Sequence, residues 1–296
     1  MTSRLLVFGR QGQVARALAA SAAPFELVFA GRDRLDLSLA SGADIAGLID
    51  EVRPAAAINA SAYTAVDRAE SEPEACARLN RDVPVLMAKA CAAADIPFVH
   101  FSTDYVFAGD KGAPYVEEDE RRPLNVYGRT KAEGELALAA LPVADAPAVV
   151  LRSSWVFSGQ GVGFVQTMAR LARERDEVSV VADQWGCPTS ATACADAALM
   201  MVARMLDRDP AARGLFHAAG DEGITWADFA EAIFQGLAAR GRRTPPRFKR
   251  ITTAEYPTAA ARPLDSRMTS ARFKQAFGWR PPPFAEGLRA ALDQLD

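Results

Sequence analysis

Short apolar runs alternate along the chain with longer stretches in which apolar residues recur every three or four positions. The runs have strand length, whereas the longer stretches, near residues 11–21, 38–52, 67–94 and 127–141, have the helical period. Short strands that alternate with helices are typical of β-α-β units and therefore predict an α/β fold with a mostly parallel sheet. The strand-like runs are R-L-L-V-F-G (4–9), F-E-L-V-F-A-G (25–31), A-A-A-I-N-A (55–60), I-P-F-V-H-F-S (96–102) and A-V-V-L-R-S-S (148–154).

The alternation loosens after about residue 155. Proline-rich pieces appear, and the strand-like runs V-S-V-V-A (178–182) and G-L-F-H-A-A (214–219) stand alone. We therefore expect residues 1–154 to form a nucleotide-binding domain whose sheet is completed by segments near 178–218. Residues 155–296 are expected to form mainly a smaller, discontinuous substrate-binding lobe.

Composition narrows the class of protein. The chain has 296 residues, is 50% hydrophobic and 24% charged, and carries a net charge of -3, which is ordinary for a globular protein and gives no footprint for nucleic acid. No apolar run reaches membrane-spanning length, and the first residues lack the apolar segment of a signal peptide. The four cysteines show no C-x-x-C spacing and are interpreted as reduced thiols. We expect a cytoplasmic protein without membrane or nucleic-acid partners.

A glycine turn follows the first predicted strand directly, in the sequence G-R-Q-G-Q-V-A. Gly9 allows a tight turn, Gly12 lets the backbone approach a pyrophosphate, and the next helix offers free N–H groups to an anion. This placement predicts a Rossmann-type doubly wound sheet that binds a dinucleotide. The cofactor-binding residues expected in the turn are Gly9, Gln11, Gly12, Gln13 and Val14.

The end of the second strand indicates which dinucleotide binds. An acid that holds the adenosine ribose is expected there, but the sequence has Gly31 followed by Arg32. Because an arginine can accept a 2'-phosphate, we favour NADPH and keep NADH as possible. In the alternative, Arg32 is solvated and Asp33 holds the ribose. Further cofactor contacts are expected from Asp36 and Leu37 and, after the third strand, from Ala60, Ala62, Tyr63 and Thr64.

Three polar side chains are expected to meet beside this cofactor. The fourth strand ends in H-F-S-T-D, and the carboxyl ends of parallel strands face the ligand crevice, so Thr103 should point into it. Tyr127 begins the following helix, and Lys131 lies one turn later on the same face. A hydroxyl, a phenol and an ammonium group can therefore converge on one site.

Several longer motifs give a more specific indication. Together they resemble the dTDP-4-dehydrorhamnose reductase family of extended short-chain dehydrogenases/reductases, and the resemblance runs nearly from end to end. Y-x-x-x-K alone marks only the superfamily, whereas V-D-x-A-E, S-T-D-Y-V-F and R-P-x-x-S are more specific. The motifs are G-x-x-G-Q-V, A-Y-T-A-V-D-R-A-E-S-E-P-E, F-S-T-D-Y-V-F-A-G, P-L-N-V-Y-G-R-T-K-A-E-G-E, L-R-S-S-W-V-F, D-Q-W-G-C-P-T and Y-P-T-A-A-A-R-P-L-D-S-R.

The resemblance implies a role for each of the three polar groups. Thr103 would hydrogen-bond the C4 carbonyl of the substrate, and Tyr127 would protonate the developing alkoxide. Lys131 would bind the nicotinamide ribose and, as a nearby cation, lower the pKa of Tyr127 from its ordinary value of about 10. The reaction implied is NADPH-dependent reduction of dTDP-4-dehydro-β-L-rhamnose.

The resemblance also implies residues that hold the sugar nucleotide. Asp104, Tyr105 and Trp155 would lie near it, and Arg262 and Ser266 would reach in from the C-terminal lobe. Arginine suits a diphosphate through its forked donors. The alternatives are that Tyr105 and Trp155 are core aromatics and that Arg262 forms a surface salt bridge.

Metal binding and assembly are expected to differ from those of some members of that family. Some members are described as dimers that hold magnesium through acidic residues, and the matching positions here are Ala17 and Thr192, which cannot serve as carboxylate ligands. We expect no metal and either a monomer or a weak homodimer. Two rival functions stay open: reduction of another 4-keto-6-deoxy sugar nucleotide, and a non-catalytic regulatory subunit that binds a dinucleotide.

Overall fold

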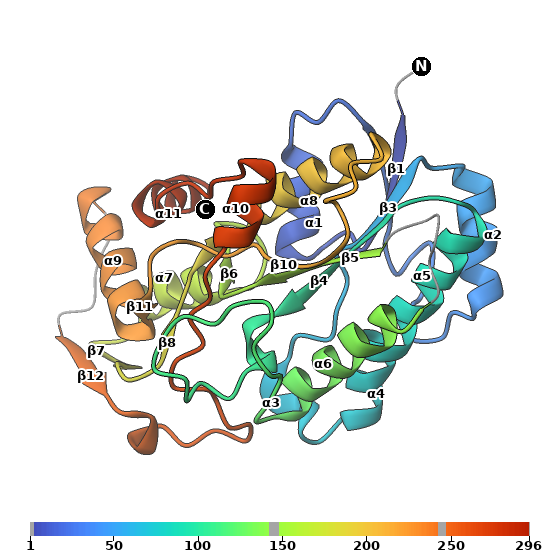
Figure 1. Ribbon diagram of the computed structural model, residues 1–296. Coiled ribbons are helices and arrows are strands. Elements are labelled where there is room, and N and C mark those ends of the chain that lie inside the picture. The colour runs from blue at the N-terminus through green and yellow to red at the C-terminus, as the bar shows by residue number, and fades with distance from the viewer. Residues whose placement is uncertain (1–2, 142–147, 242–246, 296) are drawn as a thin grey trace.

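A six-stranded parallel sheet forms the centre of the computed structural model, which describes residues 3–141, 148–241 and 247–295 (Figure 1). The strand order is β10-β5-β4-β3-β1-β2. The chain leaves β1 toward β2 on one side and then returns to β3 on the other, which opens a crevice at the carboxyl ends of β1 and β3. The strands are β1 Arg4–Phe8, β2 Glu26–Ala30, β3 Ala56–Asn59, β4 Phe98–Thr103, β5 Ala148–Ser153 and β10 Gly214–His217.

Helices cover both faces of the sheet (Figure 1). Alternate strand residues point to opposite faces, so Leu5 and Val7 of β1 pack in the cluster that includes α8, and Leu6 and Phe8 pack in the one that includes α2 and α5. Burial on both faces explains why the strands read as continuous apolar runs. One face carries α1 Gln13–Ala20, α8 Ala191–Leu206 and α10 Ala271–Phe277, and the other α2 Gly42–Val52, α5 Val83–Ala93 and α6 Val126–Ala139.

The helical stretch expected over residues 67–94 is divided into several pieces. It comprises α3 Val66–Ala69, α4 Pro73–Ala77, a π-helical turn Arg78–Asp82 and α5. The break before α4 lies at Glu72, whose backbone is not helical, and Pro73 follows at a position where proline is well tolerated. This division lets the short helix α3 lie against α6.

The chain after residue 155 builds a smaller lobe beside the carboxyl ends of the sheet strands (Figure 1). Phe157, Phe229 and Leu292 belong to its separate apolar core. The strand expected at residues 178–182 pairs within this lobe, whereas the one at 214–217 is the sixth strand of the central sheet. Its elements are the strand pairs β6 Val156–Phe157 with β9 Thr189–Ser190, β7 Glu177–Val181 with β12 Arg247–Ile251 and β8 Trp185–Gly186 with β11 Ile224–Thr225, and the helices α7 Phe164–Glu174, α9 Trp226–Ala239, the 3₁₀ turn Thr253–Glu255 and α11 Phe284–Asp293.

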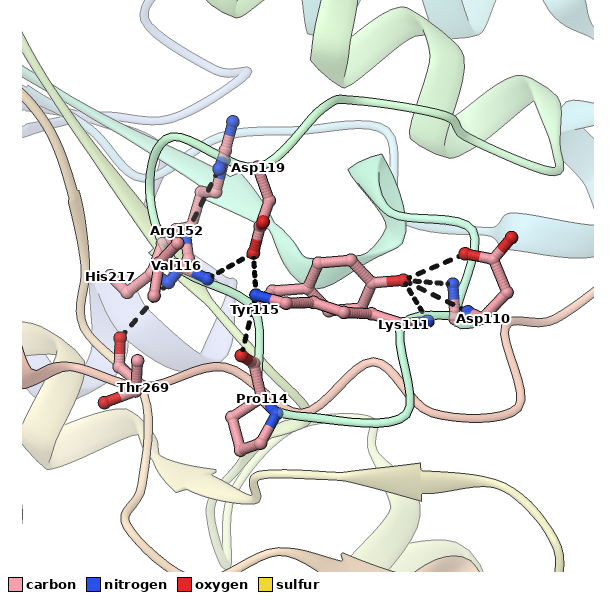
Figure 2. Close-up of polar contacts among 10 residues, drawn as sticks. Asp110, Lys111, Pro114, Tyr115, Val116, Asp119, Arg152, His217 and Thr269 are labelled. Atoms are coloured by element: carbon pink, nitrogen blue, oxygen red, sulfur yellow. Dashed lines mark hydrogen bonds and ion pairs between the residues drawn. The ribbon is translucent and has the colours of Figure 1, made fainter.

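The long connection from β4 to α6 begins with a 3₁₀ turn, Asp104–Val106, and is held in place by Tyr115 (Figure 2). The Tyr115 phenol oxygen accepts hydrogen bonds from the backbone N–H groups of Asp110 at 3.1 Å and Lys111 at 3.3 Å. The Tyr115 ring stacks on Phe107 with the ring centroids 4.1 Å apart, and the guanidinium of Arg152 lies 4.9 Å from the centroid of Phe107. Because Arg152 belongs to β5, these contacts tie the connection to the sheet.

Within the described residues, no helix is both long enough and apolar enough to cross a membrane.

Candidate active site

A cleft of about 1160 Å³ runs along the carboxyl ends of the sheet strands. Its lining comes from the turn after β1, the ends of β2, β3 and β4, the start of α6 and the smaller lobe. The structure therefore brings most of the sequence-predicted residues together. The predicted residues that line the cleft are Gly9, Gln11, Gly12, Gln13, Val14, Arg32, Asp36, Leu37, Ala60, Ala62, Thr64, Thr103, Asp104, Tyr105, Tyr127, Lys131 and Trp155.

The glycine turn forms one end of the cleft. Gly9 has φ 106°, a backbone conformation that favours glycine, and a Cβ atom there would lie 3.1 Å from the carbonyl oxygen of Ala60. Gly12 caps α1 without any side-chain hydrogen bond to the first turn. Gln13 and Val14 of that first turn line the cleft, and uncapped N–H groups at this place fit a dinucleotide diphosphate.

Two arginines lie where the adenosine end of a dinucleotide would reach. The side chain of Arg32 is 81% exposed, and its Nε lies 3.9 Å from Asp36 Oδ2. Arg10 Nη1 lies 3.6 Å from Asp33 Oδ2. Asp33, the alternative ribose ligand, is therefore paired with Arg10. Sequence reasoning missed Arg10, although a basic residue directly after Gly9 was a usable signal.

The three groups expected to do the chemistry meet at the ends of β4 and α6. Thr103 is buried and hydrogen-bonds the phenol of Tyr127. Lys131, also buried, donates from Nζ to the carbonyl oxygen of Phe101 at 2.9 Å. Burial lowers the pKa of Lys131 to about 8. A hydroxyl, a phenol and an amine thus border the same cleft.

Lys131 is not among the groups that shift the pKa of Tyr127 in the protein by itself, and the expectation that it lowers this pKa beside a bound cofactor stays a prediction. Burial raises the pKa of Tyr127 above its ordinary value, and the opposing hydrogen bond from Thr103 is too weak to reverse this. The phenol therefore keeps its proton at neutral pH, as a proton donor must.

Asp104 is a buried carboxyl group at the floor of the cleft. It accepts hydrogen bonds from Thr103 Oγ1 at 3.1 Å, Ser154 Oγ at 3.1 Å and Ser266 Oγ at 2.5 Å. Burial raises the pKa of Asp104 to about 6, although these three hydrogen bonds oppose the shift. The group is therefore oriented by its neighbours and changes charge just below neutral pH.

Comparison with known proteins agrees with this geometry. The family model of the RmlD substrate binding domain matches residues 3–296. The dTDP-4-dehydrorhamnose reductase of Sinorhizobium fredii is 43% identical over 97% of this chain and 95% of its own length, and that of Escherichia coli K12 is 37% identical over 98% and 97%. The chain belongs to the dTDP-4-dehydrorhamnose reductase family.

Solved structures share the fold of this family member. The dTDP-4-dehydrorhamnose reductase of Bacillus anthracis, determined in complex with NADP, has a TM-score of 0.86, 28% identity and coverage of 99% of this chain and 100% of its own. The UDP-glucose 4-epimerase of Thermus thermophilus shares the fold, with a TM-score of 0.78 and 20% identity. As a member of this reductase family, the chain is an oxidoreductase with a Rossmann fold.

An aromatic wall completes the cleft on the side of the smaller lobe. Trp155 lines the cleft and stacks on Trp226, with ring centroids 3.6 Å apart and an angle of 9° between the rings. The backbone of Trp155 has φ 45°, which is uncommon for a residue with a side chain. A Cβ atom at Gly186 would lie 2.2 Å from the Trp155 ring. Trp226 was missed because it lies far along the chain and in no motif.

Three predicted residues do not line the cleft. The Tyr63 hydroxyl donates to Glu72 at 2.6 Å and so points away from a cofactor. Ser266 lies behind Asp104, and Arg262 is paired with Asp67 at 2.6 Å. The motif containing each residue was recognised, but its side chain is turned toward protein partners that the sequence pattern does not specify.

The positions compared with magnesium ligands, Ala17 and Thr192, carry no carboxylate. Among the residues whose placement is described, no cluster of three or more histidine, cysteine or acidic side chains is arranged to hold a metal ion. The expectation that no metal is needed stays a prediction.

Proposed function

We propose that this protein reduces the C4 ketone of dTDP-4-dehydro-β-L-rhamnose to dTDP-β-L-rhamnose with NADPH, in the cytoplasm, as a monomer or weak homodimer. The observation that carries the proposal is that Thr103, Tyr127 and Lys131 border one cleft whose far end is the glycine turn. The names of the similar reductases and the NADP complex of the Bacillus anthracis protein support it.

The N-terminal part of the chain would hold the cofactor. Gly9 and Gly12 leave room for its diphosphate, and the open first turn of α1 supplies N–H donors. Arg32, with Arg10, would bind a 2'-phosphate, which favours NADPH over NADH. When bound, the reduced nicotinamide supplies the hydride.

Tyr127 would supply the proton. Its buried phenol is protonated at neutral pH and lies beside Thr103 at the cleft. Thr103, whose hydroxyl hydrogen goes to Asp104 in the protein by itself, would turn it to the C4 oxygen of the bound substrate. Lys131, anchored on Phe101, would bind the nicotinamide ribose and stabilise the phenolate left after proton transfer.

The sugar nucleotide would lie between the sheet and the smaller lobe. We propose that Asp104, Tyr105 and Trp155 contact it, because all three line the cleft beside Tyr127. Ser266 and Arg262 lie one layer behind and would act on the substrate through Asp104 and Tyr105. The smaller lobe would thus set which sugar fits.

The decisive experiment follows NADPH absorbance after the purified protein is mixed with dTDP-4-dehydro-β-L-rhamnose. We expect rapid oxidation of NADPH and formation of dTDP-β-L-rhamnose. Turnover only with a different 4-keto-6-deoxy sugar nucleotide would change the assigned substrate. Cofactor binding without turnover of any such sugar would indicate the regulatory alternative.

The matched control is Tyr127→Phe, which removes only the phenol oxygen. Its kcat should fall by about 100-fold or more, because general-acid catalysis contributes this much. The dissociation constant of NADPH, measured by fluorescence, should stay within about twofold. Near-normal turnover by this variant would rule out Tyr127 as the proton donor.

A further inference from the structure

An ion pair joins α3 to a segment far along the chain, residues 260–268, which we call the strap. Arg262 Nη1 donates to Asp67 Oδ1 at 2.7 Å, and Nη2 donates to Oδ2 at 2.6 Å. The backbone N–H of Ala260 adds a bond of 3.1 Å to Asp67 Oδ1. The Arg262 side chain is only 17% exposed, and its hydrogen bonds hold the pKa of Asp67 below its ordinary value. This two-pronged geometry is more specific than an ordinary surface pair.

The strap in turn contacts residues that frame the reacting groups. Asn125 Nδ2 donates to the carbonyl oxygen of Ala261 at 2.8 Å, while Asn125 Oδ1 caps α6 by accepting from Gly128 N, also at 2.8 Å. Ser266, near the other end of the strap, donates to Asp104. The strap therefore meets both the start of the helix that carries Tyr127 and the carboxyl group at the floor of the cleft.

Arg262 also reaches the cleft wall through a third contact. Its guanidinium lies close enough to the phenol of Tyr105, a residue that lines the cleft, to interact with it electrostatically. The ring of Tyr105 packs edge-to-face on that of Tyr127, with centroids 5.8 Å apart. Asp67, Arg262, Tyr105 and Tyr127 are thus in continuous contact.

Three of the five N–H donors of Arg262 already have acceptors in the protein. Nη1 bonds to Asp67 and to the carbonyl oxygen of Ala260 at 2.7 Å, and Nη2 bonds to Asp67. A guanidinium whose N–H groups bond to protein acceptors is suited to holding protein segments together. An arginine that binds a diphosphate must instead direct its paired N–H donors into the cleft.

We propose that Asp67 and Arg262 are positioning residues: their ion pair clasps the strap onto α3 and thereby fixes Tyr105 and Asp104 beside Tyr127. The inference rests on the proposed reduction of a sugar nucleotide. It differs from the role expected from the sequence, in which Arg262 binds the diphosphate directly and Asp67 has no part.

The test compares Asp67→Asn, Arg262→Gln and the double variant at saturating NADPH. If the pair is a clasp, each single change lowers kcat by about tenfold or more, because small misplacements of reacting groups are costly. The double variant should be no slower than the slower single variant, since both changes break one unit. The NADPH dissociation constant should stay within about twofold.

A direct diphosphate ligand gives a different result. Arg262→Gln would then raise KM for the sugar nucleotide with kcat unchanged, and Asp67→Asn would leave KM unchanged or lower it. Either that pattern or additive losses in the double variant would overturn the clasp. Arg262→Lys, which keeps the charge without the fork, should recover only part of kcat, and serves if the glutamine variant does not fold.

A second readout separates this proposal from the proposed function. Amide hydrogen exchange of Ser266, whose N–H donates to Trp185 O at 2.9 Å, should accelerate about tenfold in Asp67→Asn and Arg262→Gln if the strap opens. This holds even if the sugar nucleotide is not the substrate; unchanged exchange would contradict the clasp. The control Glu118→Gln breaks the exposed pair of Arg272 and Glu118, 2.7 Å long, and should change neither kcat nor the exchange of Ser266.

Discussion

At the scale of single residues, burial sets the charge of the groups that border the cleft. Lys131 and Asp104 are both buried, and each has its pKa moved toward neutrality, to about 8 and about 6. The pKa of Tyr127 is instead raised further above neutrality, so the phenol stays protonated. Desolvation disfavours the charged form of each group, so one physical cause explains all three directions.

The pKa of Asp104 predicts a pH dependence of substrate binding. Folding raises this pKa, so the carboxyl group is protonated below about pH 6 and negative above it. If the carboxylate accepts a hydrogen bond from the sugar, KM should rise about tenfold as the pH falls through 6, measured by NADPH oxidation. In Asp104→Asn, KM should be high at both pH 5 and pH 8. A wild-type KM that does not change between these values would contradict a role for the carboxylate.

Arg32 should determine the choice of cofactor. Arg32→Ala should lower kcat/KM for NADPH about tenfold and leave the value for NADH within about twofold, because only NADPH carries the 2'-phosphate. Arg34→Ala is the matched control, since Arg34 pairs with Glu51 at 2.8 Å and does not line the cleft. Equal losses with both cofactors would instead support a general role in binding the adenosine.

At the scale of elements, the start of α6 is the most constrained part of the site. Asn125 caps the helix through Gly128 N, and the N–H of Val126 donates to Glu70 Oε1 of the neighbouring α3 segment at 2.8 Å. The acids near α3 therefore have structural partners beyond the helix dipole. A Cβ atom at Gly128 would lie 2.1 Å from the carbonyl oxygen of Tyr105, so α6 can approach the end of β4 only with glycine at that position.

Gly128→Ala should consequently weaken both the fold and the activity. We expect a loss of about 1–3 kcal/mol in the free energy of unfolding, measured by urea denaturation, because the collision involves backbone that cannot move freely. Turnover should fall as well, since Tyr127 is the adjacent residue. Gly47→Ala, at an exposed site in α2 with no atom within 4 Å of the new Cβ, should stabilise the protein by about 0.5–1 kcal/mol. Equal effects at the two positions would contradict the close packing of α6.

At the scale of the whole molecule, the site lies where the sheet and the smaller lobe meet. The lobe has its own apolar core, yet the chain returns from it to supply α8, β10 and α10 to the central sheet. The strap makes a further connection between these parts through Asp67 and Asp104. The lobe is therefore tied to the sheet at several points along the sequence.

Removal of divalent metal should leave the protein unaffected. EDTA should change neither the rate of NADPH oxidation nor the sedimentation coefficient, because Ala17 and Thr192 offer no ligands for a magnesium-linked dimer. Readdition of magnesium serves as the control. A loss of activity that magnesium restores would show a metal site that the described residues do not reveal.

The sequence by itself determined most of the central sheet and of the cleft, although of the two runs expected to complete the sheet only 214–217 does so. Gly9, Thr103 and Tyr127 could be placed because they directly follow apolar strands or begin a helix, and in a parallel sheet those points share one edge. The division of the stretch 67–94 into separate helices could not be predicted from the sequence, because the π-helical turn and the break at Glu72 depend on packing against α6. Local patterns thus fix which segments line the site.

Only the tertiary structure decided which way the remaining side chains point and what charge they carry. Tyr63 turns to Glu72, Arg262 is taken by Asp67, and Trp226 arrives from another part of the chain to stack on Trp155. The pKa of Tyr127 likewise depends on how completely the folded protein buries its phenol away from water. The physical reason is that these contacts join residues distant in sequence, and desolvation is a property of the packed site as a whole.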